Sequence, residues 1–392
     1  MTTAPPPDVI YLDHNATTPV APEVLDAMLP YLTQQYGNPS SDHPLGHRAH
    51  QAVEDAREQV ASLIGAAPSE IVFTSGGTES NNLAIRGSAA AAIATRRRIV
   101  TSQVEHPATA GPCGLLEAQG WTVTHLPVTG GGTVDPDAAI HALDRDVALL
   151  TVMLAQNETG AIMPVAAAAA AARMLGIITH TDAAQAIGKI HVNVDTLGVN
   201  LLSIAGHKCY APKGVGALYV RPGTPLQPVL LGAEQEAGLR PGTENVASIV
   251  GLGVACHLAQ GRLDTEEHRL RDLRDQLWQT LTARIPGLVR HTPASNSLPN
   301  TLMVSFPDVL GRDVLANADG VAASTGSACH SGLETPSTTL LAMGVPPEIA
   351  LGAVRLSLGH GTTHADIASA ADILVGAYRT ASAATSRGHD AA

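Results

Sequence analysis

The chain has 392 residues, of which 45% are hydrophobic and 15% charged, and its formal net charge at pH 7 is −12. Nucleic-acid binding depends on a basic surface, so an acidic chain whose longest basic run is Arg96–Arg98 is not expected to bind nucleic acid directly. No apolar stretch is long enough to span a bilayer, and the first residues lack the pattern of a signal peptide. We therefore expect a cytoplasmic globular protein that does not contact membranes.

The cysteines indicate a reducing compartment and no metal centre. They form no CxxC pair and show no regular spacing, so neither a disulfide framework nor a zinc site is predicted. No resident metal is expected elsewhere in the chain. The four cysteines are Cys113, Cys209, Cys256 and Cys329.

Short apolar runs alternate with helical patterns over the first two thirds of the chain. Several of these runs are continuous and rich in Val, Ile and Leu, which is typical of strands buried on both faces of a parallel sheet. The alternation predicts an α/β fold with a mostly parallel seven-stranded sheet. The predicted strands span residues 70–76, 97–102, 121–127, 147–155, 177–182, 201–206 and 216–220.

The last third of the chain predicts a second, smaller domain. Residues 263–285 form a charged amphipathic pattern with leucines on one stripe, and shorter mixed elements follow up to a last helix at about 363–380. We predict a large domain over residues 16–260 and a smaller α+β domain built from residues 1–15 and 261–392.

Polar side chains follow five of the predicted strands. Because the carboxyl ends of parallel strands meet at one edge of a sheet, we expect these side chains to share one crevice. The stretch "TSGGTES" also turns into a helix there and leaves backbone N–H groups free for a phosphate, although a plain helix cap would have the same pattern. The strand-end residues are Gly77, Thr78, His106, Asn157, Asp182, Gln185, His207 and Lys208.

Lys208 stands out because the chain contains only three lysines, the others being Lys189 and Lys213. Arg stays protonated in proteins, whereas a lysine can become a neutral nucleophile. A lysine that forms an imine, a carboxylate beside a ring nitrogen and a phosphate cradle are what pyridoxal 5'-phosphate (PLP) requires. The residues therefore predict PLP as the cofactor.

Ten motifs in this sequence resemble those of the cysteine desulfurases, which belong to the class V aminotransferase group of fold-type I PLP enzymes. The resemblance covers residues 10 to 375 and implies the fold of a PLP-dependent transferase. The motifs, in chain order, are "YLDHNATTP", "GNPSSDHPLG", "FTSGGTESNN", "TSQVEHPA", "QNETGAIMP", "HTDAAQAIGK", "GHKCYAPKGVGALYV", "RPGTENV", "STGSACHSG" and "VRLSLG".

The resemblance implies a role for each residue that matches the family. Lys208 would hold PLP, Asp182 would pair with the ring nitrogen, and Gln185 would contact the ring hydroxyl. His106 would stack on the ring and move protons. The enzyme would be a homodimer with shared sites. The remaining implied ligands are Gly77, Thr78, His207 and Thr243 of the partner subunit for the phosphate, and Asn157 and Arg355 for the substrate carboxylate.

Cys329 lies in a Gly- and Ser-rich stretch and decides the activity that the resemblance implies. Its thiol would take sulfur from L-cysteine, release L-alanine and pass the resulting persulfide to an acceptor such as an iron–sulfur scaffold or a thiolation enzyme. Cys329 would also be able to ligate an iron–sulfur cluster transiently. Three alternatives stay open: a selenocysteine lyase acting on L-selenocysteine, a class V aminotransferase that does not use Cys329, and a scaffold that binds and regulates a partner.

Two positions depart from the family pattern. Ala205 stands three residues before the lysine, where the family commonly has a phosphate-binding Ser, and Ser203 on the same strand face is the expected substitute. His330 follows Cys329, where the family commonly has Thr, and an adjacent imidazole would lower the pKa of the thiol. A similar Cys-His pair occurs in selenocysteine lyases, which keeps the substrate open.

Overall fold

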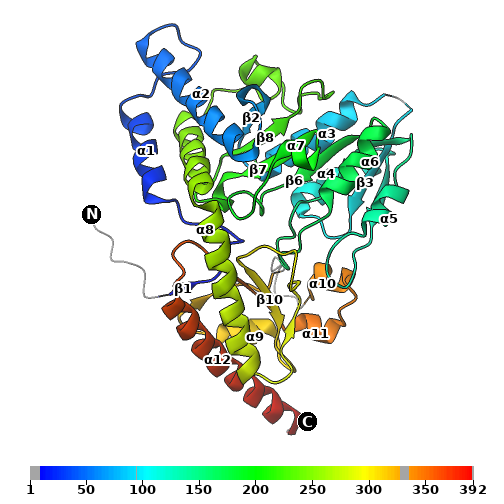
Figure 1. Cartoon of the computed structure of the whole chain (residues 1–392), viewed down its shortest axis with the longest axis vertical. Helices are drawn as coiled ribbons and strands as arrows, with labels where there is room; N and C mark the ends of the chain where they lie inside the picture. Colours follow the sequence, from blue (N-terminus) through cyan, green and yellow to red (C-terminus); the bar gives the residue numbers. More distant parts are fainter. Residues whose placement is uncertain (1–8, 94, 327–334, 391–392) are drawn as a thin grey trace.

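The computed structural model describes residues 9–93, 95–326 and 335–390, with side chains up to residue 384. All seven predicted strands form one sheet in the upper part of the molecule (Figure 1), so the prediction of a seven-stranded α/β sheet is confirmed. β8 runs antiparallel to both of its neighbours, and the other pairs are parallel. In spatial order the strands are β2 (Ile71–Thr74), β8 (Gly216–Val220), β7 (Leu201–Ala205), β6 (Ile178–Asp182), β5 (Val147–Thr151), β3 (Arg98–Ser102) and β4 (Thr122–Leu126).

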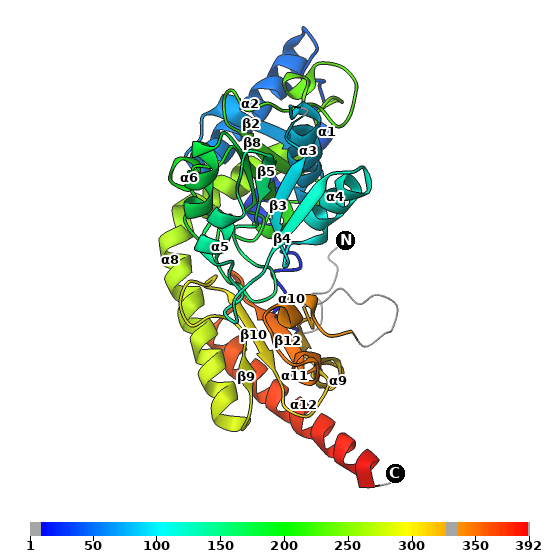
Figure 2. The ribbon, with the colours of Figure 1, turned by 90° about the vertical axis from the view of Figure 1, so that its right-hand side faces the viewer.

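Helices cover both faces of this sheet. Figure 2 shows the sheet nearly edge-on, with α3 and α4 on one side and α5 and α6 on the other. Apart from the edge strand β4, the strands are almost entirely buried on both faces, which explains their continuous apolar sequences. The helices of this part are α1 (Pro22–Thr33), α2 (Pro44–Ile64), α3 (Gly77–Ala91), α4 (Pro107–Ala118), α5 (Pro136–His141), α6 (Val165–Met174) and α7 (Val194–Leu197).

The C-terminal third forms a second hydrophobic core around a three-stranded antiparallel sheet of order β12-β10-β9. The N-terminal strand β1 (Ile10–Tyr11) returns to this region and pairs in parallel with β11 (Val321–Ala322). The other elements are β9 (Val289–Arg290), β10 (Thr301–Ser305), β12 (Ala353–Ser357), α9 (Gly311–Ala316), α10 (Thr338–Ala342), α11 (Pro347–Leu351) and α12 (His364–Asp390).

Helix α8 (Val246–Arg284) joins the two cores (Figure 1). Its first half contributes Leu252 to the core of the large sheet, and its second half contributes Leu273 to the second core. The predicted boundary at residues 260/261 falls inside this unbroken helix, because nothing between residues 246 and 284 stops a helix. By length and composition α8 would also pass as a membrane span, but 56% of its most apolar window is buried, as in a core helix.

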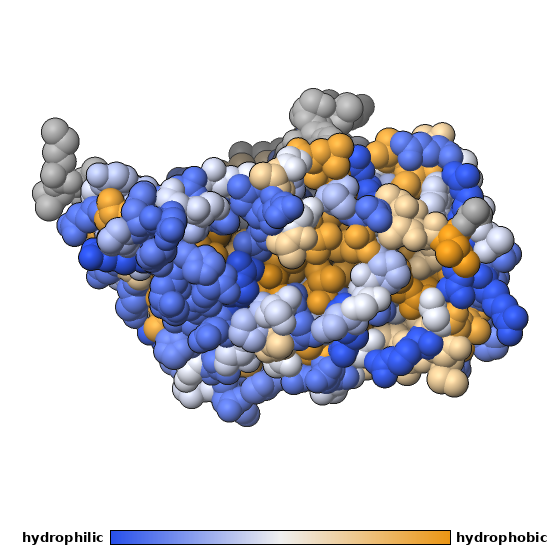
Figure 3. Space-filling model, turned by 90° about the horizontal axis from the view of Figure 1, so that it is seen from above, coloured by the Kyte–Doolittle hydropathy of each residue, from blue (hydrophilic) through white to orange (hydrophobic). Residues whose placement is uncertain are grey.

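Some large hydrophobic side chains remain exposed on the end of the molecule that carries the large sheet. Leu25, Leu29 and Leu32 are 48%, 46% and 59% exposed and recur on one face of α1. Leu231, in the segment between β8 and α8, is 88% exposed. Figure 3 looks onto this end and shows hydrophobic side chains gathered across the middle of the face.

Candidate active site

A cavity of about 500 Å³ lies where the predicted strand-end residues meet. It is lined from three directions: the carboxyl ends of the parallel strands, the segment after β1, and the small domain. The convergence expected from the parallel topology is therefore observed. The predicted residues that line the cavity are Gly77, Thr78, His106, Asn157, Asp182, Gln185, His207, Lys208 and Arg355.

Lys208 ends a short 3-10 turn, Gly206–Lys208, directly after β7. Its Nζ donates hydrogen bonds to the carbonyl oxygens of Asn15 at 2.7 Å and Ala16 at 2.8 Å. Burial, helped by the nearby Arg355 guanidinium, lowers the pKa of Lys208 to about 8, while Asp182 opposes the shift. Far more of this amine is therefore neutral, and nucleophilic, near neutral pH than of an ordinary lysine.

Asp182, at the end of β6, is held in place by two hydrogen bonds. Its Oδ2 accepts from Asn81 Nδ2 at 2.7 Å, and its Oδ1 accepts from the backbone N–H of Ala184 at 2.9 Å. Asn81 was not predicted as a site residue. Asn81 is a fully buried polar residue one turn inside α3. The only sequence feature that could have indicated its role is its place in the first turns of that helix.

His106 caps the N-terminus of α4, and its Nδ1 accepts a hydrogen bond from the backbone N–H of Ala108 at 3.1 Å. An accepting Nδ1 places the ring proton on Nε2. Burial lowers the pKa of His106, and Lys208 adds to this effect while Asp182 opposes it. The imidazole at the cavity is therefore neutral near pH 7.

Glu105, the residue before His106, holds this segment of the chain in place. Its carboxylate accepts hydrogen bonds from Ser102 Oγ at 2.6 Å and from the backbone N–H of Met153 at 3.0 Å, joining the ends of β3 and β5. Burial raises the pKa of Glu105 to about 8, although both hydrogen bonds favour the ionised form. The residue stabilises the segment that carries His106.

The N-terminus of α3 and His207 form a polar corner of the cavity. His207 Nδ1 lies 3.2 Å from Thr17 Oγ1, and burial beside Lys208 lowers the pKa of the ring to about 4. Gly77 begins α3 close to Ala205, so that a Cβ on this glycine would lie 3.1 Å from the Ala205 Cβ. Free N–H groups at a helix start are a general phosphate-binding arrangement.

The prediction that Ser203 replaces the missing hydroxyl is wrong. Ser203 shares a strand face with Ala205 but lies two residues deeper, where its side chain is fully buried and does not line the cavity. Its Oγ instead lies 3.0 Å from His180 Nε2, and the other ring nitrogen of His180 lies 2.8 Å from Thr151 Oγ1. This hydroxyl is therefore committed to an internal hydrogen-bond chain.

Arg355 reaches the cavity from β12 of the small domain and is 5% exposed. Its Nη2 donates to Asp13 Oδ1 at 2.8 Å and its Nη1 to the backbone carbonyl of Asn157 at 3.0 Å, while its buried Nε has no partner among the described residues. Arg355 thus presents donors suited to a carboxylate.

Asn15 connects Lys208 and Gln185 to the small domain and was not predicted individually. Its backbone carbonyl accepts from Lys208 and from Gln185 Nε2 at 2.9 Å, and its side-chain Oδ1 accepts from Lys189 Nζ at 3.0 Å. Its Nδ2 donates to Thr301 Oγ1 in the small domain at 2.8 Å. Asn15 therefore ties the lysine turn of the large domain to the small domain.

Besides Ser203, one predicted residue among the described residues does not line this cavity, namely Thr243. Thr243 is exposed in the loop before α8, and Cys329 lies outside the described residues, as does His330. Of the residues that flank Cys329, Gly326 lines the cavity. Ser337 Oγ donates a hydrogen bond to the buried Glu158 carboxylate at 2.6 Å.

The other three cysteines and Lys213 do not line this cavity. Cys113, Cys209 and Cys256 are buried, whereas Lys213 is exposed. Among the residues that the structure describes, no three His, Cys, Asp or Glu side chains are grouped so that they could bind a metal ion.

Comparison with known proteins agrees with this site. Residues 10–369 match the family model "Aminotransferase class-V". The chain is 48% identical over 367 residues to "Cysteine desulfurase IscS" of Dictyoglomus turgidum, a match that covers 93% of each protein. Among solved structures, "NIFS-LIKE PROTEIN" matches with a TM-score of 0.89, 36% identity and coverage of 95% of this chain and 100% of that one. "SspA in complex with cysteine" matches with a TM-score of 0.79, 35% identity and coverage of 89% and 98%.

The cavity also fits the cofactor of this family, because a lysine of lowered pKa, a buried carboxylate and the N–H groups of a helix start all line it. The predictions of a PLP enzyme and of the family are therefore confirmed. The chain belongs to the class V aminotransferases and, within them, to the PLP-dependent cysteine desulfurases.

Proposed function

We propose that this protein converts L-cysteine and the thiol of Cys329 into L-alanine and a Cys329 persulfide, using PLP bound in the described cavity. One observation carries the proposal: Lys208, with a pKa of about 8, faces the same cavity as Asp182, His106 and the small-domain Arg355. A buried amine, a carboxylate, an imidazole and a guanidinium supply the groups that this reaction requires.

Bound PLP supplies an electron sink that makes the Cα proton of an amino acid acidic and the Cβ–S bond labile. Asp182 would stabilise a positive charge at the ring nitrogen, since Asn81 and the Ala184 N–H keep its carboxylate oriented. Lys208 would hold PLP through its aldehyde group. The free amine of Lys208 would be the group that accepts the Cα proton.

Substrate binding falls to Arg355 and Asn157. The guanidinium still has N–H donors for a carboxylate, its Nε among them, while the hydrogen bond to Asp13 fixes its orientation. The Asn157 carbonyl fixes the second nitrogen of the same guanidinium. A substrate bound there would lie in the same cavity as Lys208 and His106.

The sulfur transfer balances without a further reagent. The Cβ–S bond of the substrate breaks, an S–S bond to Cys329 forms, and Cβ gains the electron pair and a proton that turn it into the methyl group of alanine. Oxidation of the two sulfurs matches reduction of the carbon. Gly326 lines the cavity, and three residues of chain span about 11 Å at most, which supports Cys329 as the acceptor.

The assembly and location of the enzyme are part of the proposal. We infer a homodimer in which the exposed leucines of α1 and the segment around Leu231 pack against a second copy, and Thr243 of the partner subunit reaches the phosphate. We further propose that the protein is cytoplasmic and hands its persulfide to an acceptor protein of iron–sulfur assembly or thiolation.

Two lysine variants test the proposed function. Lys208→Ala should give a colourless protein that forms no alanine from L-cysteine, whereas Lys213→Ala should stay yellow and active because Lys213 is exposed and outside the cavity. Alanine formation in Lys208→Ala at the wild-type rate would contradict the proposal. Relative rates with L-cysteine and L-selenocysteine separate a desulfurase from a selenocysteine lyase.

A further inference from the structure

Lys189 is a buried lysine with no carboxylate partner among the described residues. Its side chain is 8% exposed, and burying an amine is unfavourable unless its hydrogen bonds are satisfied. The Nζ donates to two neutral amide oxygens, Gln185 Oε1 at 2.7 Å and Asn15 Oδ1 at 3.0 Å. Lys189 does not line the active-site cavity, so its hydrogen bonds act on the site through these two residues.

The hydrogen bond from Lys189 determines which way round the Gln185 side-chain amide lies. Gln185 Oε1 faces the donor Lys189, so its NH2 group faces the acceptor on the other side, the Asn15 carbonyl, at 2.9 Å. One N–H of this NH2 group then remains, and Gln185 lines the cavity. Without Lys189, the amide could turn over and present its oxygen instead.

The Asn15 amide is held in the same way. Its Oδ1 accepts from Lys189 and from Asn300 Nδ2 at 3.1 Å, and its Nδ2 donates to Thr301 Oγ1. With its side chain fixed from both domains, Asn15 keeps its backbone carbonyl at the position that receives Lys208 and Gln185.

We propose that Lys189 is a positioning residue for the cofactor. By holding Gln185 Oε1 it directs the remaining N–H of this amide toward an acceptor oxygen on the cofactor ring, namely the ring hydroxyl of PLP. This inference deepens the proposed function and rests on it, because it requires PLP in the described cavity.

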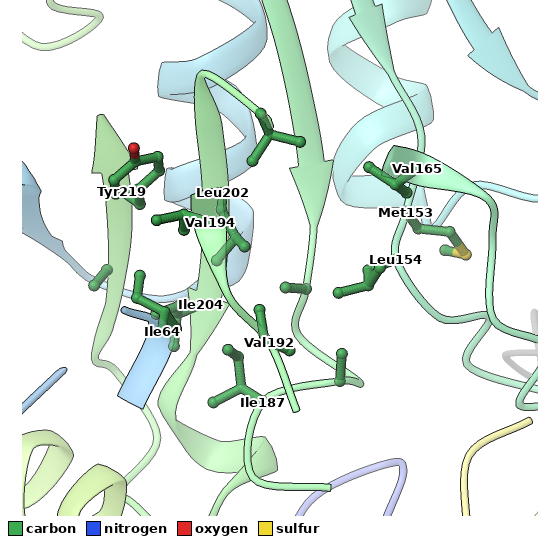
Figure 4. Close-up of a cluster of buried hydrophobic side chains, with 14 of the residues drawn as sticks. Ile64, Met153, Leu154, Val165, Ile187, Val192, Val194, Leu202, Ile204 and Tyr219 are labelled. Atoms are coloured by element: carbon green, nitrogen blue, oxygen red, sulfur yellow. The ribbon is translucent and has the colours of Figure 1, made fainter. Parts of the chain in front are cut away.

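The surroundings of Lys189 suit this role. Gln185 and Lys189 stand on one turn, which Ile187 anchors by pointing into the apolar cluster with Val192 and Ile204 (Figure 4). Burial, with help from Lys208 and Arg355, lowers the pKa of Lys189 well below its ordinary value. A neutral amine still carries two N–H donors for its two acceptors, so the positioning does not require a charge.

Binding of two ligands to the apoenzyme tests the role. Pyridoxine 5'-phosphate has the ring hydroxyl but no aldehyde, and its 3-deoxy counterpart lacks the hydroxyl. One oriented hydrogen bond should make the wild type prefer the first ligand about tenfold. Lys189→Met should abolish this preference, whereas Lys213→Met, which removes an exposed lysine, should keep it.

The ratio of the two dissociation constants separates a loss of Gln185 orientation from a general loss of structure. A cavity that is loosened as a whole binds both ligands more weakly by the same factor, so the ratio does not change. Lys189→Gln, with a smaller polar side chain, serves as a second variant if Lys189→Met does not fold, and should also reduce the ratio. A wild-type ratio in folded Lys189 variants would overturn this inference alone. Failure of the wild type to bind either ligand would overturn the proposed function as well.

Discussion

At the scale of single residues, the site works by changing the protonation of ordinary side chains. Lys208 is a good example, because burial and a neighbouring cation both disfavour its ammonium form. His106 and His207 are kept neutral by the same burial. The cavity thus holds an amine and two imidazoles without their full positive charge, beside an ionisable carboxylate.

Imine formation should therefore follow the titration of Lys208. Because only the neutral amine attacks an aldehyde, the rate of PLP binding to the apoenzyme should rise with pH and reach half its maximum near pH 8. Arg355→Gln removes a cation that lowers this pKa, so the midpoint should move to higher pH. Stopped-flow absorbance measures both rates. A wild-type midpoint near the ordinary lysine value of 10.5 would contradict this account.

Arg355→Lys should separate the contribution of the positive charge at this position from that of the guanidinium geometry. Lysine keeps the positive charge but loses the guanidinium N–H donors, so kcat/KM for L-cysteine should fall about 10- to 100-fold, a loss of ~1.5–3 kcal/mol. Most of the loss should appear in KM. Arg312→Lys, a substitution on the half-exposed first turn of α9, is the matched control and should have no effect.

At the scale of elements, α8 shows how close packing decides where glycine is tolerated. Gly253 faces α2, and a Cβ there would lie 2.6 Å from the Ala56 Cα. Gly261, two turns further along the same helix, is exposed and has open space around it. The same residue type therefore has opposite consequences at the two positions.

Two alanine substitutions test this difference. Gly253→Ala should lower the midpoint of thermal unfolding, because the added methyl group forces α2 and α8 apart at a cost of about 1–3 kcal/mol. Gly261→Ala should raise the midpoint, since alanine favours an exposed helix by about 0.5–1 kcal/mol. Shifts of the same sign in both variants would contradict the packing described here.

The elements also show what a sequence can predict. Asp182 and Lys208 were predictable because Asp182 ends one buried strand and Lys208 follows another, and parallel strands end at a common edge. Ser203 was predicted wrongly because a strand pattern gives the face of a residue but not its depth below the cavity. Asn15 could not be predicted individually, since its partners Lys189, Lys208 and Thr301 lie more than 170 residues away in the chain.

At the scale of the whole molecule, the cavity depends on contacts between the two cores. Asn15 binds Lys208 on one side and Thr301 on the other, and Arg355 enters from the small domain. The continuous helix α8 connects the two cores. Residues far apart in sequence are therefore held at one site by the fold rather than by local structure.

The proposed homodimer predicts a native mass near twice the 40.2 kDa of one chain. Burying the exposed leucines of α1 against a second copy is the driving force, so Leu29→Glu combined with Leu32→Glu should shift the protein toward monomer. Light scattering after size exclusion measures this change. A wild-type mass equal to one chain would contradict the dimer.

The most direct test of the sulfur transfer is the mass of the peptide that contains Cys329 after the enzyme reacts once with L-cysteine. The proposal predicts one added sulfur atom on Cys329, an equal amount of L-alanine, and no addition on the buried Cys113, Cys209 or Cys256. L-alanine formed at the wild-type rate by Cys329→Ala, with no sulfur on Cys329 in the wild type, would contradict it.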